Sequence, residues 1–168
     1  MTVLVVMGVS GCGKSTVAGL LSARLGWSFM EGDSLHPDVN IAKMESGQPL
    51  TDEDRWPWLD EVADWIEGQH AAGEDGLITC SALKRSYRDV LNRRGEGVVF
   101  VYLAGKRRTL EERMRARVGH FMPPGMLASQ LETLEEPRPD EPSIRVPIEQ
   151  SSAEIAEQVM RELGLDHR

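Results

Sequence analysis

The sequence predicts an α/β fold in which helices flank a five-stranded parallel sheet. Short apolar runs typical of buried strands alternate with segments whose apolar residues recur at helical spacing. A glycine-rich loop separates the first apolar run from the first helical pattern. The 168 residues are 40% hydrophobic and 27% charged, which is the composition of a globular chain rather than a disordered one. We therefore expect a single domain over residues 1–168.

The first strand and the first helix have the clearest patterns. Val3–Met7 is a continuous apolar run, which predicts a strand buried on both faces. Gly8–Gly13 follows as a loop, and Gly26 ends the helix that comes next. The apolar residues that define this helix are Val17, Leu20, Leu21 and Leu25. Trp27–Met30 predicts a second short strand, and Asp33 lies just beyond its end.

Residues 34–58 differ from the rest of the chain. They contain three prolines, several polar residues and little periodicity, which predicts an excursion from the sheet. Helical spacing returns at Leu59, Val62, Ala63 and Ile66. We assign the excursion, about residues 34–75, to substrate binding.

The remaining strands continue the alternation. Leu77–Cys80 and Val98–Leu103 predict the third and fourth strands, and Tyr87–Leu91 is part of a helix between them. Ile144–Ile148 has the period-two pattern of a fifth strand. Pro147 cannot donate a backbone hydrogen bond, so this strand is expected at an edge of the sheet or to end there.

Two pairs of residues predict helix starts in the second half. Thr109 with Glu112, and Ser151 with Glu154, have the spacing of capping boxes. Between the two helices that they open, Met126–Leu134 again has helical spacing.

Charge, cysteine content and hydropathy exclude several classes of function. The 19 basic and 27 acidic residues give a net charge of −8, which makes the chain a poor nucleic-acid binder. Cys12 and Cys80 form at most one disulfide, so a reducing cytoplasm is expected. No stretch approaches the roughly 20 apolar residues that span a bilayer. We expect a soluble cytoplasmic protein that binds neither nucleic acid nor membrane.

The most specific motif is GVSGCGKS at residues 8–15, which fits the phosphate-binding P-loop pattern G-x-x-x-x-G-K-[ST]. Such a loop holds nucleotide phosphates with its backbone N–H groups and the start of the following helix. Lys14 is expected to reach the β- and γ-phosphates, and the Ser15 hydroxyl to bind Mg²⁺. The predicted nucleotide-binding residues are Gly8, Val9, Ser10, Gly11, Cys12, Gly13, Lys14, Ser15 and Thr16.

Asp33 is the acidic residue that best fits a P-loop enzyme. The N-K-x-D motif of GTPases is absent from the sequence, and neither Leu77–Cys80 nor Val98–Leu103 ends in the aspartate of a Walker B strand. A carboxylate after the second strand is typical of small-molecule kinases of the nucleoside-monophosphate-kinase type. Asp33 would either orient and deprotonate an acceptor hydroxyl or hold Mg²⁺ through water. Glu31 is expected to lie farther from the reaction.

Arg113 and Arg117 lie four residues apart on one predicted helix. Like charges at this spacing repel each other, and an anion near them would relieve the repulsion. The Pro- and Gly-rich segment Gly119–Gly125 follows directly. We therefore predict a lid over about residues 117–130 that brings these arginines to the transferred phosphoryl group. The alternative is a solvated face whose arginines pair with neighbouring glutamates.

Two further arginines, Arg55 and Arg88, are candidates for binding a substrate carboxylate or phosphate, because a guanidinium can make two parallel hydrogen bonds. A surface ion pair is the alternative for each. His36 and His120 lie in the two segments assigned to function.

Four segments together resemble the small P-loop gluconokinases, which phosphorylate D-gluconate with ATP. The segments are MGVSGCGKSTV (7–17), GDSLHPDVNIAKMESGQPLTDEDRWPWL (32–59), CSALKRSYRD (80–89) and GHFMPPGMLASQLETLE (119–135). The second segment is far more specific than the P-loop and lies in the excursion. Cys12 departs from the family pattern, where a serine is more usual.

The resemblance implies ATP and Mg²⁺ as cofactors, transfer to the 6-hydroxyl of gluconate, and a homodimer. The residues that we predict to be catalytic are Lys14, Asp33, Arg113 and Arg117, and the resemblance matches Asp33 and Arg117 among them. Its implied substrate-binding residues are Asp33, His36, Lys43, Arg55, Lys84, Arg88 and His120. Two alternatives remain open: another small-molecule kinase of this fold, acting on shikimate or a nucleoside monophosphate, or a nucleotide-binding regulatory module.

Overall fold

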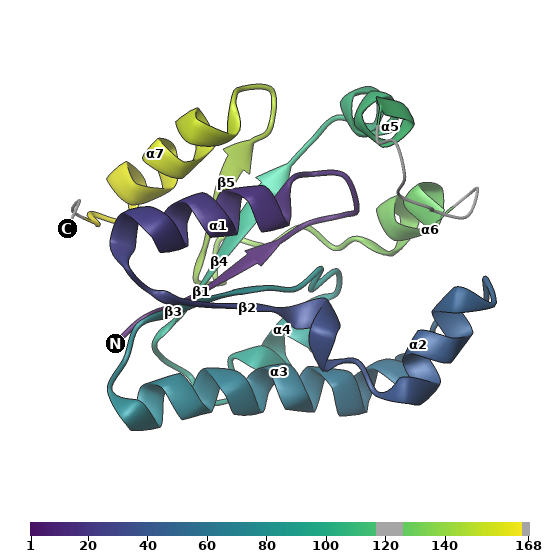
Figure 1. Cartoon of the computed structure of the whole chain (residues 1–168), viewed down its shortest axis with the longest axis horizontal. Helices are drawn as coiled ribbons and strands as arrows, with labels where there is room; N and C mark the ends of the chain where they lie inside the picture. The colour runs from purple at the N-terminus through teal and green to yellow at the C-terminus, as the bar shows by residue number, and fades with distance from the viewer. Residues whose placement is uncertain (117–125, 166–168) are drawn as a thin grey trace.

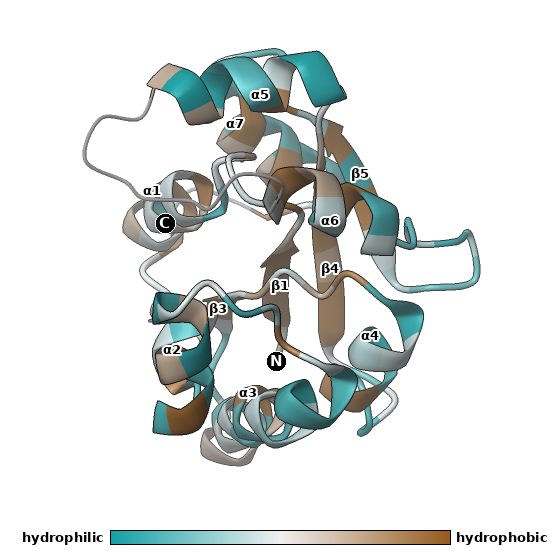
Figure 2. Ribbon diagram, turned by 90° about the vertical axis from the view of Figure 1, so that its right-hand side faces the viewer, coloured by the Kyte–Doolittle hydropathy of each residue, from teal (hydrophilic) through white to brown (hydrophobic). Residues whose placement is uncertain are grey.

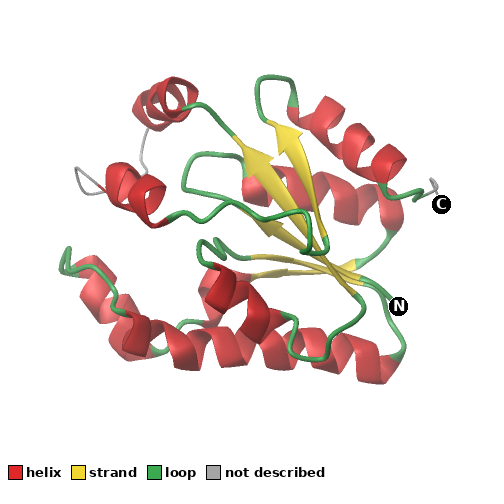
Figure 3. Cartoon of the chain, turned by 180° about the vertical axis from the view of Figure 1, so that it is seen from behind, coloured by secondary structure: helices red, strands yellow, loops and turns green. Residues whose placement is uncertain are grey.

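The structure, a computed structural model, describes residues 1–116 and 126–165. Within these residues the strands form one five-stranded parallel sheet in the order β2-β3-β1-β4-β5 (Figure 3). The strands are β1 (Val3–Met7), β2 (Ser28–Glu31), β3 (Gly76–Thr79), β4 (Val98–Ala104) and β5 (Ser143–Pro147). The predicted fold class is confirmed, and β5 with its proline lies at an edge, as expected.

Helices cover both faces of this sheet (Figure 1). The helices on one face are α1 (Lys14–Leu25) and α7 (Ser152–Glu162), and those on the other are α3 (Asp52–Ala72) and α4 (Arg85–Leu91). The side chains of β1 alternate between the two cores: Leu4 and Val6 pack on the α1 side, and Val3, Val5 and Met7 on the α3 side. All five are fully buried, so the first apolar run contributes to both cores.

Four short helical segments lie beyond the carboxyl ends of the strands. They are η1 (Gly32–Leu35), α2 (Asp38–Glu45), α5 (Arg107–Ala116) and α6 (Met126–Thr133). Figure 2 looks onto this end of the molecule, where the strands are largely brown and α5 is largely teal. Open α/β sheets bind their ligands outside the carboxyl ends of the strands, so these segments surround the place where a site is expected.

The excursion is more regular than the sequence predicted. Residues 34–58 contain the second half of η1, all of α2 and the first turns of α3. Thr51 caps α3 with Asp54, through Asp54 N to Thr51 Oγ1 at 3.2 Å and Thr51 N to Asp54 Oδ2 at 2.9 Å. Pro57 then lies inside α3. The helical pattern of α2 is hard to detect because its apolar residues Val39 and Ile41 are exposed.

One predicted helix start is wrong and another is confirmed. α5 begins at Arg107, and Glu112 accepts a hydrogen bond from Arg108 Nε at 3.3 Å, so Thr109 lies inside the helix and does not cap it. An i,i+4 ion pair has extended the helix beyond the predicted cap. Ser151 and Glu154 do form a capping box at the start of α7.

Candidate active site

The P-loop joins β1 to α1 in a conformation that requires glycine. A Cβ on Gly8, whose φ is +144°, would lie 2.8 Å from Cys12 Sγ and 3.0 Å from the carbonyl oxygen of Leu103. Gly13 precedes α1 in the left-handed conformation, with φ at +92°. The first N–H groups of a helix have no partners within it, and the helix dipole favours an anion there. The loop therefore has the backbone that phosphate binding needs.

The polar side chains of the loop lie at the start of α1. Lys14 Nζ donates to the carbonyl oxygens of Gly8 at 2.9 Å and Val9 at 3.2 Å. Ser15 and Thr16 are exposed on the first turn of α1. The lysine ammonium and the Ser15 hydroxyl are thus both held at the mouth of the loop.

Helix α5 packs against this loop and brings Arg113 to it. Met114 Sδ lies 3.0 Å from the position that a Cβ on Gly11 would occupy. Arg113 Nη1 lies 3.8 Å from the corresponding position on Gly13, and its Nη2 donates to the carbonyl oxygen of Ile148 at 2.7 Å. The backbone of the P-loop and a guanidinium therefore come together, as the phosphate-binding prediction requires.

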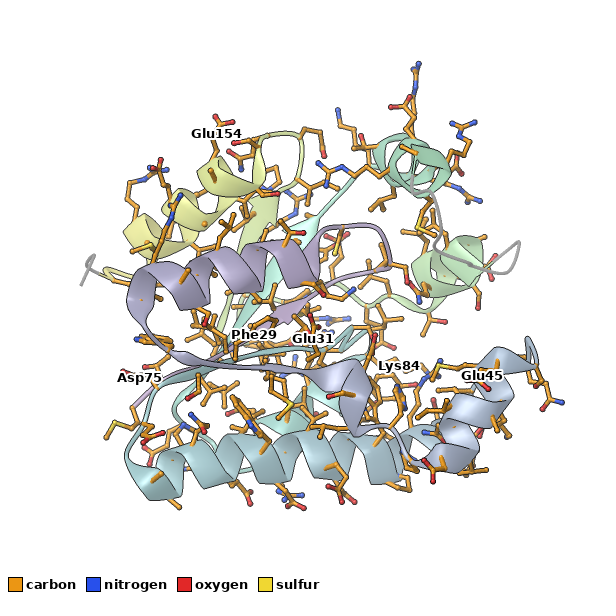
Figure 4. The ribbon with its side chains drawn as sticks, viewed as in Figure 1. Phe29, Glu31, Glu45, Asp75, Lys84 and Glu154 are labelled. Carbon is orange, nitrogen blue, oxygen red and sulfur yellow. The ribbon has the colours of Figure 1, made fainter. Side chains whose placement is uncertain are left out.

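The end of β2 places two carboxylates at the carboxyl edge of the sheet. Thr79 Oγ1 donates to Glu31 Oε2 at 2.5 Å and accepts from the N–H of Gly32 at 3.2 Å. A Cβ on Gly32 would lie 2.0 Å from the carbonyl oxygen of Thr79, so only glycine allows this contact between β2 and β3. Asp33 follows in η1 and is exposed. Figure 4 shows Glu31 at the end of β2, on the side of the molecule where α2 and α6 lie.

Cys80 is buried directly after β3, and its thiol is subject to the charges of both Asp33 and Lys14. Burial raises the pKa of Cys80 to about 12, the charge of Asp33 raises it further, and the charge of Lys14 opposes that rise. The charges of Asp33 and Lys14 therefore act in opposite directions on the thiol of Cys80, which directly follows β3.

His36 is a neutral, fixed imidazole beside Asp33. Its ring stacks on Trp58 with the centroids 4.1 Å apart, and Asn40 Nδ2 donates to its Nδ1 at 3.1 Å. Burial lowers the pKa of His36, Asp33 counteracts this and Arg55 adds to it. Because Nδ1 accepts from Asn40, the ring proton belongs on Nε2, where it can be donated to a ligand.

Lys43 and Asp54 form an ion pair. Lys43 Nζ lies 2.7 Å from Asp54 Oδ2. The hydrogen bond from Lys43 is the main cause that lowers the pKa of Asp54 to about 2. The charge of Lys43 is thus already balanced, which leaves it less able to bind a substrate anion than the resemblance implies.

Arg55 and Lys84 are gathered around a single carboxylate, that of Asp52. Lys84 Nζ lies 3.2 Å from Asp52 Oδ2, and Arg55 Nη1 lies 3.7 Å from Asp52 Oδ1. The Tyr87 hydroxyl donates to Asp52 Oδ1 and accepts from Arg55 Nη1 at 3.0 Å. Two cations share one anion, so this cluster of Asp52, Arg55, Lys84 and Tyr87 carries a surplus positive charge. Figure 4 shows Lys84 in the region between Glu31 and α2.

Arg88 does not join these residues. Its side chain is 1% exposed and its Nε lies 2.6 Å from Glu141 Oε1. Nη2 donates to the second oxygen of Glu141 at 3.3 Å, and Nη1 to the carbonyl of Ala82 at 2.7 Å. The guanidinium is therefore fully used in joining α4 to the segment before β5. The structure places Arg88 in the protein framework and not among the residues that face a substrate.

Arg117, His120 and most of the predicted lid, residues 117–125, lie outside the described residues. The alternative assignment of the basic face is partly observed, because Arg107 and Arg108 pair with Glu111 and Glu112. Arg113 does not take part in those pairs and instead reaches Ile148.

Sequence reasoning missed several residues that the structure places in the site. They are Asn40, Asp52, Tyr87 and Gln130. The family segments contain all four, and their polarity was the only available signal. Gln130 is a special case because it contacts Ser10 across 120 positions of sequence.

Comparisons with known proteins identify the family. A family model described as an AAA domain matches residues 3–137. The gluconokinase of Gluconobacter oxydans (strain 621H) is 52% identical over 158 residues, which are 94% of this chain and 89% of that protein. The chain belongs to the gluconokinase family. Among the solved gluconokinases, that of Sinorhizobium meliloti 1021 is 47% identical, with a TM-score of 0.88 over 97% of this chain and 91% of that one.

A second solved structure agrees with this family assignment. The unliganded sugar kinase from Janibacter sp. HTCC2649 has a TM-score of 0.91 and 45% identity, over 98% of this chain and 95% of that one. The gluconokinase likeness therefore covers nearly the whole chain, including the excursion and the segment that follows α6.

Proposed function

We propose that the chain transfers the γ-phosphoryl group of ATP to the 6-hydroxyl of D-gluconate, giving 6-phospho-D-gluconate and ADP. The gluconokinase names and high identities of its relatives support this reaction. The observation that carries the proposal is the surplus positive charge of Arg55 and Lys84 at the carboxyl end of the strands, where the P-loop and Asp33 also lie (Figure 4). One end of the site then suits a nucleotide and the other a monocarboxylate.

The nucleotide end is built from the P-loop. Its fit to phosphate rests on Gly8 and Gly13, whose positive φ angles give the loop the backbone conformation of a phosphate-binding turn. Lys14 binds the β- and γ-phosphates, and Arg113 adds a second cation beside Gly13. Arg117 is proposed to act with Arg113 on the transferred group.

Mg²⁺ fits the donor groups at this end. Ser15 offers an exposed hydroxyl on the first turn of α1, and Asp33 an exposed carboxylate. In the described residues, no group of three or more His, Cys, Asp or Glu side chains gathers around one point. A small oxygen donor set suits Mg²⁺, which keeps several waters and shares the substrate phosphates. When bound, the ion neutralises charge on those phosphates.

The acceptor end of the site orients gluconate by binding its two termini, the carboxylate and the 6-hydroxyl, with different residues. Arg55 and Lys84 bind the carboxylate, and His36 donates its Nε2 proton to a hydroxyl oxygen. Asp33 then accepts a hydrogen bond from the 6-hydroxyl and turns its oxygen toward the γ-phosphorus. His120 is proposed to contribute from the lid, and Lys43 to act through its pair with Asp54.

The transfer itself needs little covalent help from the protein. The 6-oxygen forms the new bond to phosphorus as the bond from phosphorus to the ADP oxygen breaks, and Asp33 takes the hydroxyl proton late. Lys14 and the arginines stabilise the charge that moves onto ADP. Positioning therefore supplies most of the rate, and the carboxylate supplies the proton acceptor.

Assembly and location follow as part of the same proposal. A homodimer in the cytoplasm is supported by the family resemblance, and the two buried free cysteines agree with a reducing environment. The net charge of −8 supports the absence of nucleic-acid binding. Among the described helices, none has both the length and the apolar character needed to cross a membrane.

Identification of the product tests the proposed reaction. Purified protein is incubated with Mg-ATP and ¹³C-labelled D-gluconate, and the product is analysed by NMR. We expect phosphorus coupling at carbon 6. A phosphate at any other carbon, or no new phosphate ester, would overturn the assignment of Asp33 to the 6-hydroxyl.

A further inference from the structure

The cluster formed by Asp52, Arg55, Lys84 and Tyr87 contains a carboxylate that the binding of a substrate carboxylate does not require. Two cations alone would attract a carboxylate more strongly than two cations with an anion between them. Yet the Asp52 side chain is 41% exposed and lies against both cations. A carboxylate at this position therefore weakens the attraction for the substrate anion unless it makes a favourable contact of its own.

Asp52 has hydrogen-bonding capacity left for such a contact. A carboxylate has about four acceptor sites. Tyr87 donates to Oδ1, and Lys84 Nζ lies 3.3 Å from Oδ1 and 3.2 Å from Oδ2. The hydrogen bond from Tyr87 and the one from Lys84 lower the pKa of Asp52, so it stays ionised and accepts only. The ligand group that suits a remaining site is a hydroxyl, which donates.

Arg55 offers the complementary half of the contact. Only its Nη1 donates to a protein acceptor within the described residues, and its side chain is 25% exposed. Nε and Nη2 are thus available for a substrate carboxylate. A carboxylate bound by Arg55 and a hydroxyl bound by Asp52 would be neighbours on the substrate.

Tyr87 holds the two groups in this arrangement. Its side chain is buried, and its ring meets Trp56 edge-on with the centroids 5.5 Å apart. Its hydroxyl donates a hydrogen bond to Asp52 and accepts one from Arg55, so the hydroxyl is used within the protein both as a donor and as an acceptor. Burial and the bond to Asp52 raise the pKa of Tyr87, which keeps the donated proton in place. Tyr87 is a positioning residue.

From this geometry we infer that Asp52 is a specificity-determining residue that recognises the hydroxyl next to the substrate carboxylate. The site then selects 2-hydroxy acids, with Arg55 and Lys84 on the carboxylate and Asp52 on the 2-hydroxyl. This inference rests on the proposed gluconate kinase activity and adds to it the group that separates gluconate from acids without a 2-hydroxyl.

The test compares D-gluconate with 2-deoxy-D-gluconate, which keeps the carboxylate and the 6-hydroxyl. The full-length protein is assayed for ADP release with each acid, as the wild type and as Asp52→Ala. We expect the wild type to prefer gluconate by about tenfold or more in kcat/KM, the size of a hydrogen bond to a charged group. In Asp52→Ala the two acids should come within about twofold of each other, with kcat for gluconate unchanged.

A structural effect would not give this pattern. Removal of Asp52 leaves the two cations unscreened, so the KM for the deoxy acid should stay equal or fall while that for gluconate rises. Glu53→Ala removes the same type of charge from the same turn of α3 and should leave the tenfold preference intact. Tyr87→Phe keeps the ring packing, so it should raise the KM for gluconate by about threefold or more without changing kcat.

The outcomes separate this inference from the proposed function. If the wild type releases ADP with neither acid, the gluconate kinase proposal fails. If gluconate is a substrate but the wild type does not prefer it, or if the preference persists in Asp52→Ala, the role of Asp52 is overturned and the kinase proposal stands. Should Asp52→Ala fail to fold, Asp52→Asn keeps the shape and must reduce the preference to about threefold or less.

Discussion

The side-chain oxygen of Gln130 accepts a hydrogen bond from the backbone N–H of Ser10, with 2.7 Å between Gln130 Oε1 and Ser10 N. Ser10 is the third residue of the P-loop, and Gln130 lies on α6. Lys14 likewise points to the carbonyl groups of the loop itself. An amide oxygen from α6 thus occupies a donor that the P-loop would otherwise offer to phosphate.

This contact predicts that Gln130 competes with nucleotide for the Ser10 N–H. Gln130→Ala should lower the Kd for Mg-ATP by about threefold or more, because phosphate no longer displaces a hydrogen bond of typical net strength. Gln130→Glu should raise the Kd for Mg-ATP by about tenfold, since a negatively charged carboxylate would face the negatively charged phosphates. Isothermal titration calorimetry measures both. A weaker affinity in Gln130→Ala would instead make Gln130 a ligand of the nucleotide.

Asp33 is predicted to act on the reacting hydroxyl. Asp33→Asn keeps the size and a hydrogen-bond acceptor but removes the proton acceptor, so kcat should fall by about 10²–10⁴-fold with little change in the KM for gluconate. Steady-state ADP release measures this, with Asp38→Asn, an exposed aspartate of α2, as the matched control. A kcat within a factor of a few of the wild type would rule out Asp33 as the base.

Arg55 and Lys43 are both cations of the excursion, but we predict that they differ in how much they contribute to gluconate binding. Arg55→Ala should raise the KM for gluconate by about 10–100-fold and leave that for ATP unchanged, because a charged hydrogen bond to the carboxylate is lost. Lys43→Ala should change the KM for gluconate by less than about threefold, since Asp54 already balances the charge of Lys43. Equal increases in KM for gluconate and ATP in Arg55→Ala would move Arg55 to the phosphate side.

Arg88 is predicted to stabilise the fold without contacting substrate. Arg88→Met leaves Glu141 buried and unpaired, which should cost about 3–5 kcal/mol and lower Tm by roughly 10 °C. Arg85→Met breaks the exposed pair with Asp140 and should cost less than about 1 kcal/mol. Thermal unfolding by circular dichroism compares the two. A normal Tm with a tenfold higher KM for gluconate in Arg88→Met would restore the substrate role.

The parts of the fold that local patterns determine were predictable. Val3–Met7 is apolar throughout because both faces of β1 are buried, and the P-loop glycines are required by the positive φ angles of the loop itself. The start of α5 was missed because two ion pairs, such as Arg107 with Glu111, extend the helix beyond its apparent cap.

The differences between the expected and the observed surroundings of the site residues have a common physical origin. Arg88 resembled a substrate ligand because its partner Glu141 lies 53 positions away, and no local pattern reveals that pair. The hydrogen bond from Tyr87 to Asp52 likewise joins two helices. Residue types and a family resemblance indicated which cations belong to the site, but only the tertiary contacts show that Lys43 is paired with Asp54 and Arg88 with Glu141.

The measurement that tests the central claim most directly is ADP release from Mg-ATP with different acceptors. Purified protein is supplied in turn with D-gluconate, shikimate, AMP, CMP or no acceptor. We predict that gluconate alone stimulates turnover well above the rate without acceptor. Stimulation by shikimate or a nucleoside monophosphate instead, or by no compound, would contradict the assignment of this chain as a gluconate kinase.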